Sequence, residues 1–237
     1  MTGADGEDRP MRPGGTAPHV IVRDVTDPEL ADSDRHHLER VRRLRPGDDV
    51  SVTDGRGRWR WCRFGAVLEP DGDIVTDPPP APPVTVAFAL VKGERPELVV
   101  QKLTEVGVDR IVPFLADRSV VRWEPAKADR NAERLRRVAL EAAMQSRRTW
   151  VPEVADVTTF ARVCALPGAA GAERDGRPPS LDRPTLLVGP EGGWSPSERA
   201  ALPALVGLGP TVLRAETAAI TGGGVLCALR SGVVAPA

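Results

Sequence analysis

The sequence predicts an α/β protein in two unlike parts, a small β domain followed by a larger domain with a parallel sheet. Alternating residues on either side of Asp54-Gly55 predict a β-hairpin in the first part. Five prolines within residues 77–83 predict a stiff, extended linker. After this linker, apolar runs alternate with helical patterns, which is typical of parallel strands because their connections must cross the sheet.

The composition is that of a folded protein with a sizeable core, since 41% of the 237 residues are hydrophobic and the net charge is -1. Cys62, Cys164 and Cys227 are odd in number and widely spaced, which fits neither a disulfide framework nor a zinc site. These cysteines therefore predict a reduced, cytoplasmic compartment. Adjacent residues on a helix point in different directions, so His36 and His37 cannot bind one ion together and we expect no metal. No apolar stretch approaches the ~20 residues that cross a bilayer, so we expect no membrane partner.

The predicted β domain covers residues 19–76. Residues 1–18 are expected to form a disordered tail, because they are rich in Gly, Pro and charge and lack the apolar core of a signal peptide. The elements predicted in order are a strand at 20–22, a helix from Asp34 to Leu44, and strands at 50–53 and 59–64.

The hairpin lies in a basic segment. From Arg35 to Arg63 the chain has nine arginines against four acidic residues. Alternation divides the second hairpin strand into two faces: Trp59, Trp61 and Arg63 on one, and Arg60, Cys62 and Phe64 on the other. Exposed tryptophans beside arginines would stack on RNA bases, whereas tryptophans of small β domains more often belong to the core. The pattern does not decide which face is buried, and we favour a core position for the tryptophans.

The second domain, expected over residues 84–237, opens with a strand, a helix and a strand that together predict a βαβ unit. The bounds predicted for these elements and for the long helix after them are 84–91, 96–106, 110–114 and Lys127–Arg147. Lys92 and Arg95 lie in the loop after the first strand, where parallel sheets present ligand-binding groups; a solvated charged turn is the alternative. Residues Cys164 to Arg183, rich in Pro, Gly, Ala and charge, are expected to form a flexible surface loop.

The most informative part of the sequence is Thr185 to Ala218. The apolar run Leu186–Val188 predicts a buried strand that ends on a glycine-rich loop at 189–193. Ser195 and Glu198 have the spacing of a capping box, which predicts the start of a helix. The elements predicted next are a second glycine loop at 208–210, a strand at 211–213, a polar cluster at 214–217 and a final helix at 217–234. This order builds a ligand crevice at the strand ends of an α/β sheet.

The sequence GPEGG at 189–193, followed by LGPTVLRAETA at 208–218, closely resembles the C-terminal signature of the SPOUT class of RNA methyltransferases. Within that class the resemblance is to the ribosomal small-subunit methyltransferase E family. Three further segments resemble this family in the same order, and the resemblance covers most of the chain from about residue 19: Arg35–Asp48, Leu90–Phe114 and Arg136–Arg148. One departure is Met144, where the family usually has glutamate.

The resemblance implies a fold and an activity. The first domain would be a PUA-like RNA-binding β-barrel, and the second a SPOUT-type α/β domain with a trefoil knot. Periodicity could not predict a knot, because general topology rules argue against one. The implied reaction is S-adenosyl-L-methionine-dependent methylation of N3 of a uridine, uracil 1498, in 16S ribosomal RNA. The implied partners are the small ribosomal subunit and a second copy of the chain in a homodimer.

The resemblance also assigns site residues. The cofactor pocket would contain Leu187, Val188, Gly189, Pro190, Gly192, Gly193, Leu208, Gly209, Val212 and Leu213. The catalytic residues would be Arg214, Glu216 and Thr217. The RNA-binding residues would be Arg35, Arg40, Arg42, Arg43, Arg45, Lys92, Gln145 and Arg147.

The catalytic residue types suit methyl transfer to a weakly acidic uracil nitrogen. The methyl donor carries its own electrophile, so neither a metal nor a covalent nucleophile is needed. Arg214 would stabilise negative charge on the uracil oxygens, and Glu216 would either hold Arg214 or accept the N3 proton. Thr217 would hydrogen-bond to the base or cap the last helix. An ordinary Arg-Glu surface pair is the structural alternative.

Two other functions stay open. A different SPOUT methyltransferase would modify transfer RNA or a ribose 2′-hydroxyl, and a catalytically inert module would bind RNA only. The stretch Arg35–Asp48 favours the 16S family, and the intact LRAETA argues against inertness. A Rossmann-type enzyme is disfavoured, because the first strand of the second domain ends in Lys-Gly-Glu-Arg and not in Gly-x-Gly-x-x-Gly.

Overall fold

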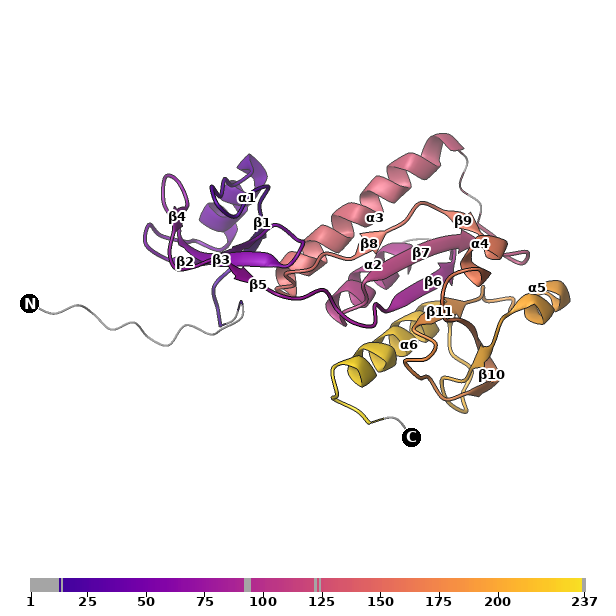
Figure 1. Cartoon of the computed structure of the whole chain (residues 1–237). Coiled ribbons are helices and arrows are strands. Elements are labelled where there is room, and N and C mark those ends of the chain that lie inside the picture. Colours follow the sequence, from indigo (N-terminus) through magenta and orange to yellow (C-terminus); the bar gives the residue numbers. More distant parts are fainter. Residues whose placement is uncertain (1–12, 14, 92–94, 122, 124, 236–237) are drawn as a thin grey trace, which may run out of the picture. The chain divides into compact units, whose positions relative to one another are not determined.

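The computed structural model describes residues 13, 15–91, 95–121, 123 and 125–235. Internal contacts divide the chain into two compact units (Figure 1). The first unit extends to Pro79 and includes Arg147–Trp150, and the second comprises Pro80–Ser146 and Val151–Ala237. Lys92 and most of the predicted tail at 1–18 lie outside the described residues.

The first unit is built on a five-stranded sheet of order β1-β2-β3-β4, in which β5 also pairs with β3. The strands are β1 (His19–Ile21), β2 (Asp49–Thr53), β3 (Arg58–Arg63), β4 (Glu69–Pro70) and β5 (Val75–Thr76). The predicted hairpin is confirmed, because β2 and β3 pair antiparallel. In its turn, the Asp54 carboxylate accepts a hydrogen bond from the Arg56 N–H (2.8 Å), and Gly55 has a positive φ of 71°.

The helix predicted from Asp34 to Leu44 is shorter and begins earlier. An α-helix, α1 (Asp32–His36), continues as a π-helix, η1 (His37–Val41). The Arg42 N–H donates to the His37 carbonyl over the wide π spacing (3.0 Å). Arg43 then adopts the left-handed conformation with φ 57°, which ends the helical path before Leu44.

Burial along β3 does not follow the predicted division into two faces. Trp59 is 1% exposed, as expected for a core tryptophan, but Cys62 and Phe64 of the opposite face are also buried. Trp61 is half-buried, and its ring meets that of Trp59 edge to face at 6.2 Å. Beyond the end of β3, the Arg35 guanidinium of α1 lies over the Phe64 ring, 5.8 Å from its centroid.

The segment Arg147–Trp150 belongs to the first unit although it follows α3 (Pro125–Gln145). Its Thr149 carbonyl accepts from the Gly57 N–H (2.9 Å), and a Cβ at Gly57 would lie 2.6 Å from the Trp150 ring. Arg147 has a φ of 57° and lies beyond the helix, so the prediction that it ends the last helical turn is wrong. The chain therefore leaves the first unit after Pro79, returns for these four residues, and leaves again.

His19, at the start of β1, connects this segment to the sheet. Its Nδ1 lies 2.9 Å from the Ser51 hydroxyl oxygen, and its Nε2 donates to the Arg148 carbonyl at 3.2 Å. Burial lowers the pKa of His19 from 6.5 to about 4, because an imidazolium there would lose its water shell.

The second unit is a parallel sheet with helices on both faces (Figure 1). Its strand order is β12-β10-β11-β6-β7-β8, and β9 also pairs with β7. The strands are β6 (Thr85–Ala89), β7 (Arg110–Leu115), β8 (Glu153–Val154), β9 (Thr158–Thr159), β10 (Ala169–Arg177), β11 (Thr185–Val188) and β12 (Leu205–Val206). The helices are α2 (Arg95–Glu105), α3, α4 (Phe160–Cys164), α5 (Pro196–Ala201) and α6 (Ala215–Arg230). The predicted βαβ unit is confirmed as β6-α2-β7, whose strands pair in parallel.

Two apolar cores lie on opposite faces of this sheet. Alternate residues such as Val86 and Leu186 join one core with α2, α3 and α6. The intervening residues, such as Ala87 and Leu187, join the other core with α4 and Trp194. Because the central strands are covered on both sides, they appear in the sequence as unbroken apolar runs.

Two predictions for the second unit are wrong. Residues 164–183 are not a flexible loop, because they contain β10, which pairs in parallel with both β11 and β12. Small residues are required there by close packing: a Cβ at Gly171 would lie 2.5 Å from the Leu202 side chain. Residues 211–213 are not a strand; the edge strand is β12, which precedes the second glycine loop.

The last helix, α6, begins two residues earlier than predicted and carries three consecutive glycines. A Cβ at Gly222 would lie 2.2 Å from Leu186, and one at Gly223 would lie 2.7 Å from Leu103. A Cβ at Gly224 would meet nothing within 4 Å. Close packing against the sheet and α2 therefore explains the first two glycines but not the third.

Alanine substitutions at two of these glycines should have opposite effects. Gly224→Ala should raise the free energy of unfolding by up to about 1 kcal/mol, because a helical glycine costs that much relative to alanine. Gly223→Ala should lower it by about 1 kcal/mol or more, because the methyl group must displace buried side chains. Urea unfolding of both variants measures the difference, and shifts in the same direction would contradict the packing explanation.

His19 should make the first unit less stable in acid. Since its folded-state pKa of about 4 lies below the ordinary 6.5, the unfolded chain binds a proton between these values that the folded chain does not. The contribution of neutral His19 to the free energy of unfolding is fully present above pH 6.5. It is lost as the pH falls towards 4, by up to about 3 kcal/mol. Thermal unfolding from neutral to acid pH should show a steeper loss for the wild type than for His19→Gln. An equal loss of stability in the wild type and in His19→Gln would contradict this role of His19.

Candidate functional site

The candidate site is a cavity of about 220 Å³ at the carboxyl end of β11 and beside the middle of β10. Its walls come from two loops and the first turns of α6: the glycine loop, residues 189–193, and the second loop, residues 208–213. Parallel strands end at one edge of a sheet, so these separate segments meet there.

Close contact with Trp194 shapes the glycine loop. A Cβ at Gly189 would lie 3.0 Å from the Trp194 ring, which itself stacks on Phe114 with centroids 6.1 Å apart. Gly193 has a positive φ of 70°, and its N–H closes a turn by donating to the Pro190 carbonyl (2.8 Å). The backbone can therefore approach a ligand without intervening side chains.

The helix after the glycine loop is held by the predicted capping box, which is confirmed. The Ser195 hydroxyl oxygen accepts from the Glu198 N–H (3.2 Å), and the Glu198 carboxylate accepts from the Ser195 N–H (2.9 Å). The other oxygen of Glu198, which is 3% exposed, accepts from the Asp117 N–H after β7 (2.8 Å). These bonds satisfy a buried carboxylate and tie the loop to the neighbouring strand.

Most residues predicted for the cofactor pocket come together in this cavity. Those that line it are Val188, Gly189, Pro190, Gly193, Leu208, Gly209, Val212 and Leu213. Leu187 does not, because its side chain is fully buried in the core on the other face of the sheet. Gly192 does not either; its carbonyl accepts a hydrogen bond from the Arg118 guanidinium (2.9 Å).

Sequence reasoning missed the side of the cavity formed by β10. Ala172, Glu173 and Arg174 line it, and they lie in the segment predicted to be a loop. Glu173 is held by Arg199 on α5, at 3.6 Å. The only signal was a short run of small residues, Ala169–Ala172, which fits a buried strand as well as a loop.

The predicted catalytic residues lie at the start of α6, beside the cavity. Arg214 is the N-cap residue and is exposed, and no salt bridge joins it to Glu216 within the described ranges. The Glu216 side chain, 12% exposed, instead lies 3.7 Å from Arg95. Of the two roles expected for Glu216, the structure therefore does not show the one in which it holds Arg214. Thr217 is exposed inside the helix and does not cap it, because the helix begins at Ala215.

Glu216 has one unusual atom. Its Oε2 is buried and accepts no hydrogen bond from the part of the chain that the structure describes. The Nε of Arg95 lies 3.7 Å from Oε1 of Glu216, and its Nη1 donates to the Glu191 carboxylate of the glycine loop (3.0 Å). A buried carboxylate oxygen without a donor is unfavourable, so this atom suits a hydrogen-bond donor brought by a ligand.

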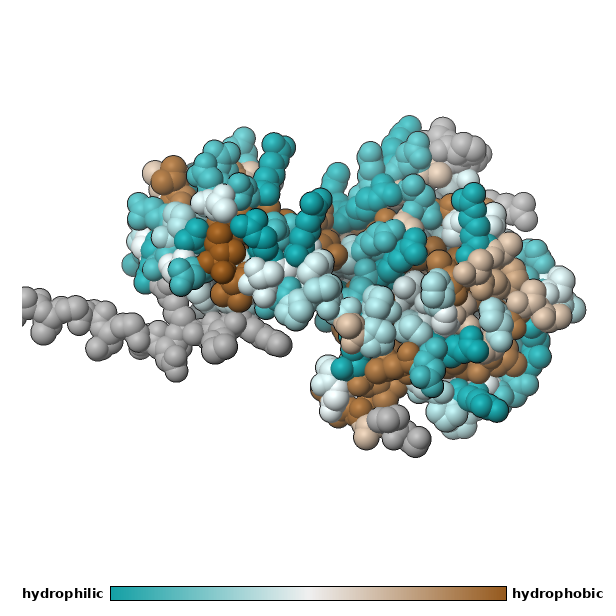
Figure 2. Space-filling model, viewed as in Figure 1, coloured by the Kyte–Doolittle hydropathy of each residue, from teal (hydrophilic) through white to brown (hydrophobic). Residues whose placement is uncertain are grey.

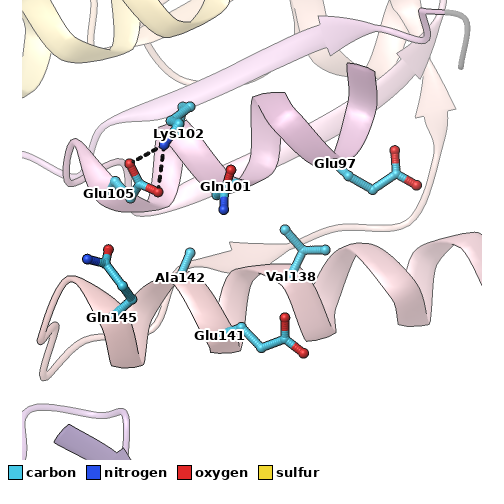
Figure 3. A pocket seen from close by; sticks show the side chains of 8 residues that line it. All are labelled: Glu97, Gln101, Lys102, Glu105, Val138, Glu141, Ala142 and Gln145. Carbon is cyan, nitrogen blue, oxygen red and sulfur yellow. Dashed lines mark hydrogen bonds and ion pairs between the residues drawn. The ribbon is translucent and has the colours of Figure 1, made fainter. Parts of the chain in front are cut away.

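A larger hollow of about 580 Å³ lies between α2 and α3, and Figure 3 shows the side chains that line it. Gln145, predicted to bind RNA, lies there beside Glu105 and Glu141. Lys102 is paired with Glu105 at 2.8 Å. Carboxylates disfavour a phosphate backbone, and no glycine loop reaches this hollow, so it is not the candidate site.

The predicted RNA-binding arginines of the first unit differ in exposure and in the hydrogen bonds of their side chains. Those with exposed side chains are Arg40, Arg42, Arg43 and Arg45. Arg35 is half-buried and donates to the Gly65 carbonyl (2.9 Å). Arg147 donates to the carbonyls of Gly15 and Ala17. Arg42 donates to the Thr16 carbonyl (3.1 Å).

Neither a metal centre nor a membrane-spanning helix is found within the described ranges. No group of three or more His, Cys, Asp or Glu side chains there could hold a metal ion. No helix there is long and apolar enough to cross a membrane.

Comparison with known proteins agrees with this geometry. Residues 78–226 match a family described as an RNA methyltransferase domain, and residues 30–66 match an RNA methyltransferase PUA domain. The crystal structure of a probable rRNA-methyltransferase from Porphyromonas gingivalis has a TM-score of 0.76 at 28% identity, covering 92% of this chain and 100% of that one. The fold and the site thus define an RNA methyltransferase with a SPOUT-type α/β domain after a PUA-like domain.

The family follows from the sequence relatives. Ribosomal RNA small subunit methyltransferase E from Mycobacterium bovis is 38% identical over 223 residues, covering 82% of this chain and 84% of the relative. The chain belongs to the ribosomal RNA small subunit methyltransferase E family. A family member from Neisseria gonorrhoeae, solved bound to S-adenosyl methionine, has the same fold, with a TM-score of 0.75 at 23% identity over 91% of this chain and 97% of that one.

Proposed function

We propose that this chain transfers a methyl group from S-adenosyl-L-methionine to N3 of a uracil in 16S ribosomal RNA, uracil 1498 by the family resemblance. The observation that supports this most is the cavity between the two glycine loops, with Arg214 and Glu216 directly beyond its wall at Ala215. The cation of Arg214 and the carboxylate of Glu216 therefore lie within one helical turn of the wall of the cofactor cavity.

The cavity has surfaces that suit this cofactor. Leu208, Leu213 and Ala218 offer apolar contact for an adenine ring, and the backbone of the glycine loop offers hydrogen-bonding groups. The carboxylate of Glu173 suits positively charged sulfonium and ammonium groups. When bound, S-adenosyl-L-methionine supplies a methyl group on a positive sulfur, and transfer to N3 breaks the carbon–sulfur bond with its electron pair left on sulfur.

The chain itself must remove the N3 proton and stabilise the base that remains. Glu216 is the proposed proton acceptor, because its Oε2 accepts no hydrogen bond from the described residues and complements the N3–H donor of uracil. Arg214 is the proposed partner of the uracil oxygens, where negative charge develops as the proton leaves. Its exposed guanidinium is available for that role.

The exposed arginines of the first unit are the proposed contacts to RNA phosphates, with Lys92 and Arg147 as further proposed contacts. Gln145 is not proposed as one, because it lies among carboxylates. We also propose a homodimer that acts in the cytoplasm on RNA within the small ribosomal subunit. Figure 2 shows apolar surface around the position of α6 and the residues after it, which include Val233 and Val234 at 77% and 43% exposure. A patch of this kind suits pairing with a second copy, and light scattering gives the mass that tests it.

Mass-spectrometric mapping of modified uridines in 16S ribosomal RNA tests the reaction. Cells or subunits lacking this protein should lack one N3-methyluridine, and the purified protein with S-adenosyl-L-methionine should restore it. Methylation of transfer RNA or of a ribose hydroxyl instead would assign the chain another SPOUT activity. Binding of RNA without any methylation would make it an inert module.

The two neighbouring glycines of the glycine loop should differ in their effect on cofactor binding. Gly193→Val should weaken S-adenosyl-L-methionine binding at least about tenfold, because a branched side chain is strained at φ 70° and enters the cavity. Gly192→Val should change it less than about threefold, because that residue faces Arg118 outside the cavity. Calorimetry measures both, and equal losses would contradict the assignment of the cavity.

Arg214→Ala should affect turnover and not cofactor binding. Loss of one preorganised electrostatic donor lowers turnover about 10²-fold, while the dissociation constant for S-adenosyl-L-methionine should be nearly unchanged. Single-turnover methylation and calorimetry separate these effects. Lost cofactor binding with unchanged turnover at saturation would place Arg214 in the cofactor pocket.

Changing Arg42, Arg43 and Arg45 together to alanine should weaken RNA binding and flatten its salt dependence, because fewer counterions would be released. Cofactor affinity should not change. A titration of 16S RNA at several salt concentrations measures the slope. An unchanged slope would mean that these arginines serve only as surface charge.

A further inference from the structure

Arg95, the first residue of α2, joins both parts of the candidate site. Its Nη1 donates to the Glu191 carboxylate of the glycine loop at 3.0 Å, and its Nε lies 3.7 Å from Oε1 of Glu216 on α6. Three segments that are distant in the sequence therefore meet at one guanidinium. The two carboxylates use different nitrogen atoms of Arg95, which a lysine could not provide from one ammonium group.

The two contacts differ in strength. Arg95 and Glu191 are 41% and 42% exposed, so their ion pair contributes little stability in water. The Glu216 side chain is 12% exposed, so little water can stabilise its charge in place of Arg95. The stronger consequence of losing Arg95 is therefore a change in the position of Glu216, with a smaller change in the glycine loop.

We propose that Arg95 is a positioning residue for methyl transfer, which rests on the proposed function: it holds Glu216 by Oε1 and leaves Oε2 to receive the N3 proton. Glu191 fixes the orientation of Arg95 from the other side. The proton passes from N3 to Oε2, and Arg95 keeps its own proton and charge throughout. Arg95 touches neither the base nor the methyl group in this arrangement.

A double-substitution cycle on turnover tests the action through Glu216. With saturating RNA and cofactor, Arg95→Gln should lower turnover about tenfold, within the range of coupling between contacting residues, and leave the KM for RNA within about threefold. In a Glu216→Gln background the same change should have no further effect. Arg95→Lys should recover only part of the loss. Equal losses in both backgrounds, or full activity of Arg95→Lys, would overturn the proposal.

Cofactor binding without RNA tests the contact with the glycine loop separately. Arg95→Gln and Glu191→Gln should each weaken S-adenosyl-L-methionine binding by about twofold to fivefold, and the double variant no further, because both remove one ion pair. Additive losses would overturn this part. The matched control is Arg110→Gln, which removes the pair with Glu153 at the opposite edge of the sheet and should change neither readout.

These two measurements keep the proposals distinguishable. If the wild-type chain methylates no RNA, the proposed function fails, and the binding cycle still decides whether Arg95 holds the glycine loop. If the wild type is active but Arg95→Gln retains full turnover, only the role of Arg95 is overturned. Thermal unfolding of every variant shows whether a loss comes from misfolding, and Arg95→Gln should melt within about a few degrees of the wild type.

Discussion

The packing of Trp194 is the constraint on which the candidate site depends. Its indole N–H donates to the Ala172 carbonyl on β10 (3.2 Å), and its ring stacks on Phe114 of β7 while lying against the backbone of Gly189. One side chain thus fixes the distance between the glycine loop and the β10 wall of the cavity. A larger residue at position 189 would push the glycine loop away from the Trp194 ring.

The sequence predicts the elements next to this site well where a local rule determines them. Ser195 and Glu198 have the capping-box spacing, and Leu186–Val188 is an apolar run on a strand covered on both faces. Strand β10 could not be predicted in the same way. Its Gly171 is required by the approach of Leu202, which comes from a different part of the chain, and such a long-range contact leaves no local pattern.

Long-range contacts also limit what the sequence predicts about the individual residues of the site. Residues 208–213 reach the cavity as predicted, although they are not a strand, because Leu208 and Leu213 pack on the core beneath them. Leu187 and Gly192 are neighbours of cavity residues in the sequence, yet strand alternation turns the first to the other face, and Arg118 holds the second. A resemblance identifies the segment, but only the fold decides which side chains and backbone groups face the ligand.

The separation of Arg214 from Glu216 bears on the chemistry. If the two were paired, the carboxylate would already neutralise the guanidinium, and neither would respond strongly to a change of charge on a base. In the structure Glu216 lies beside Arg95, and Arg214 is exposed at the start of the same helix. Under the proposed function, a cation and a carboxylate two residues apart take opposite roles: Glu216 receives the proton, and Arg214 stabilises the charge that the proton leaves behind.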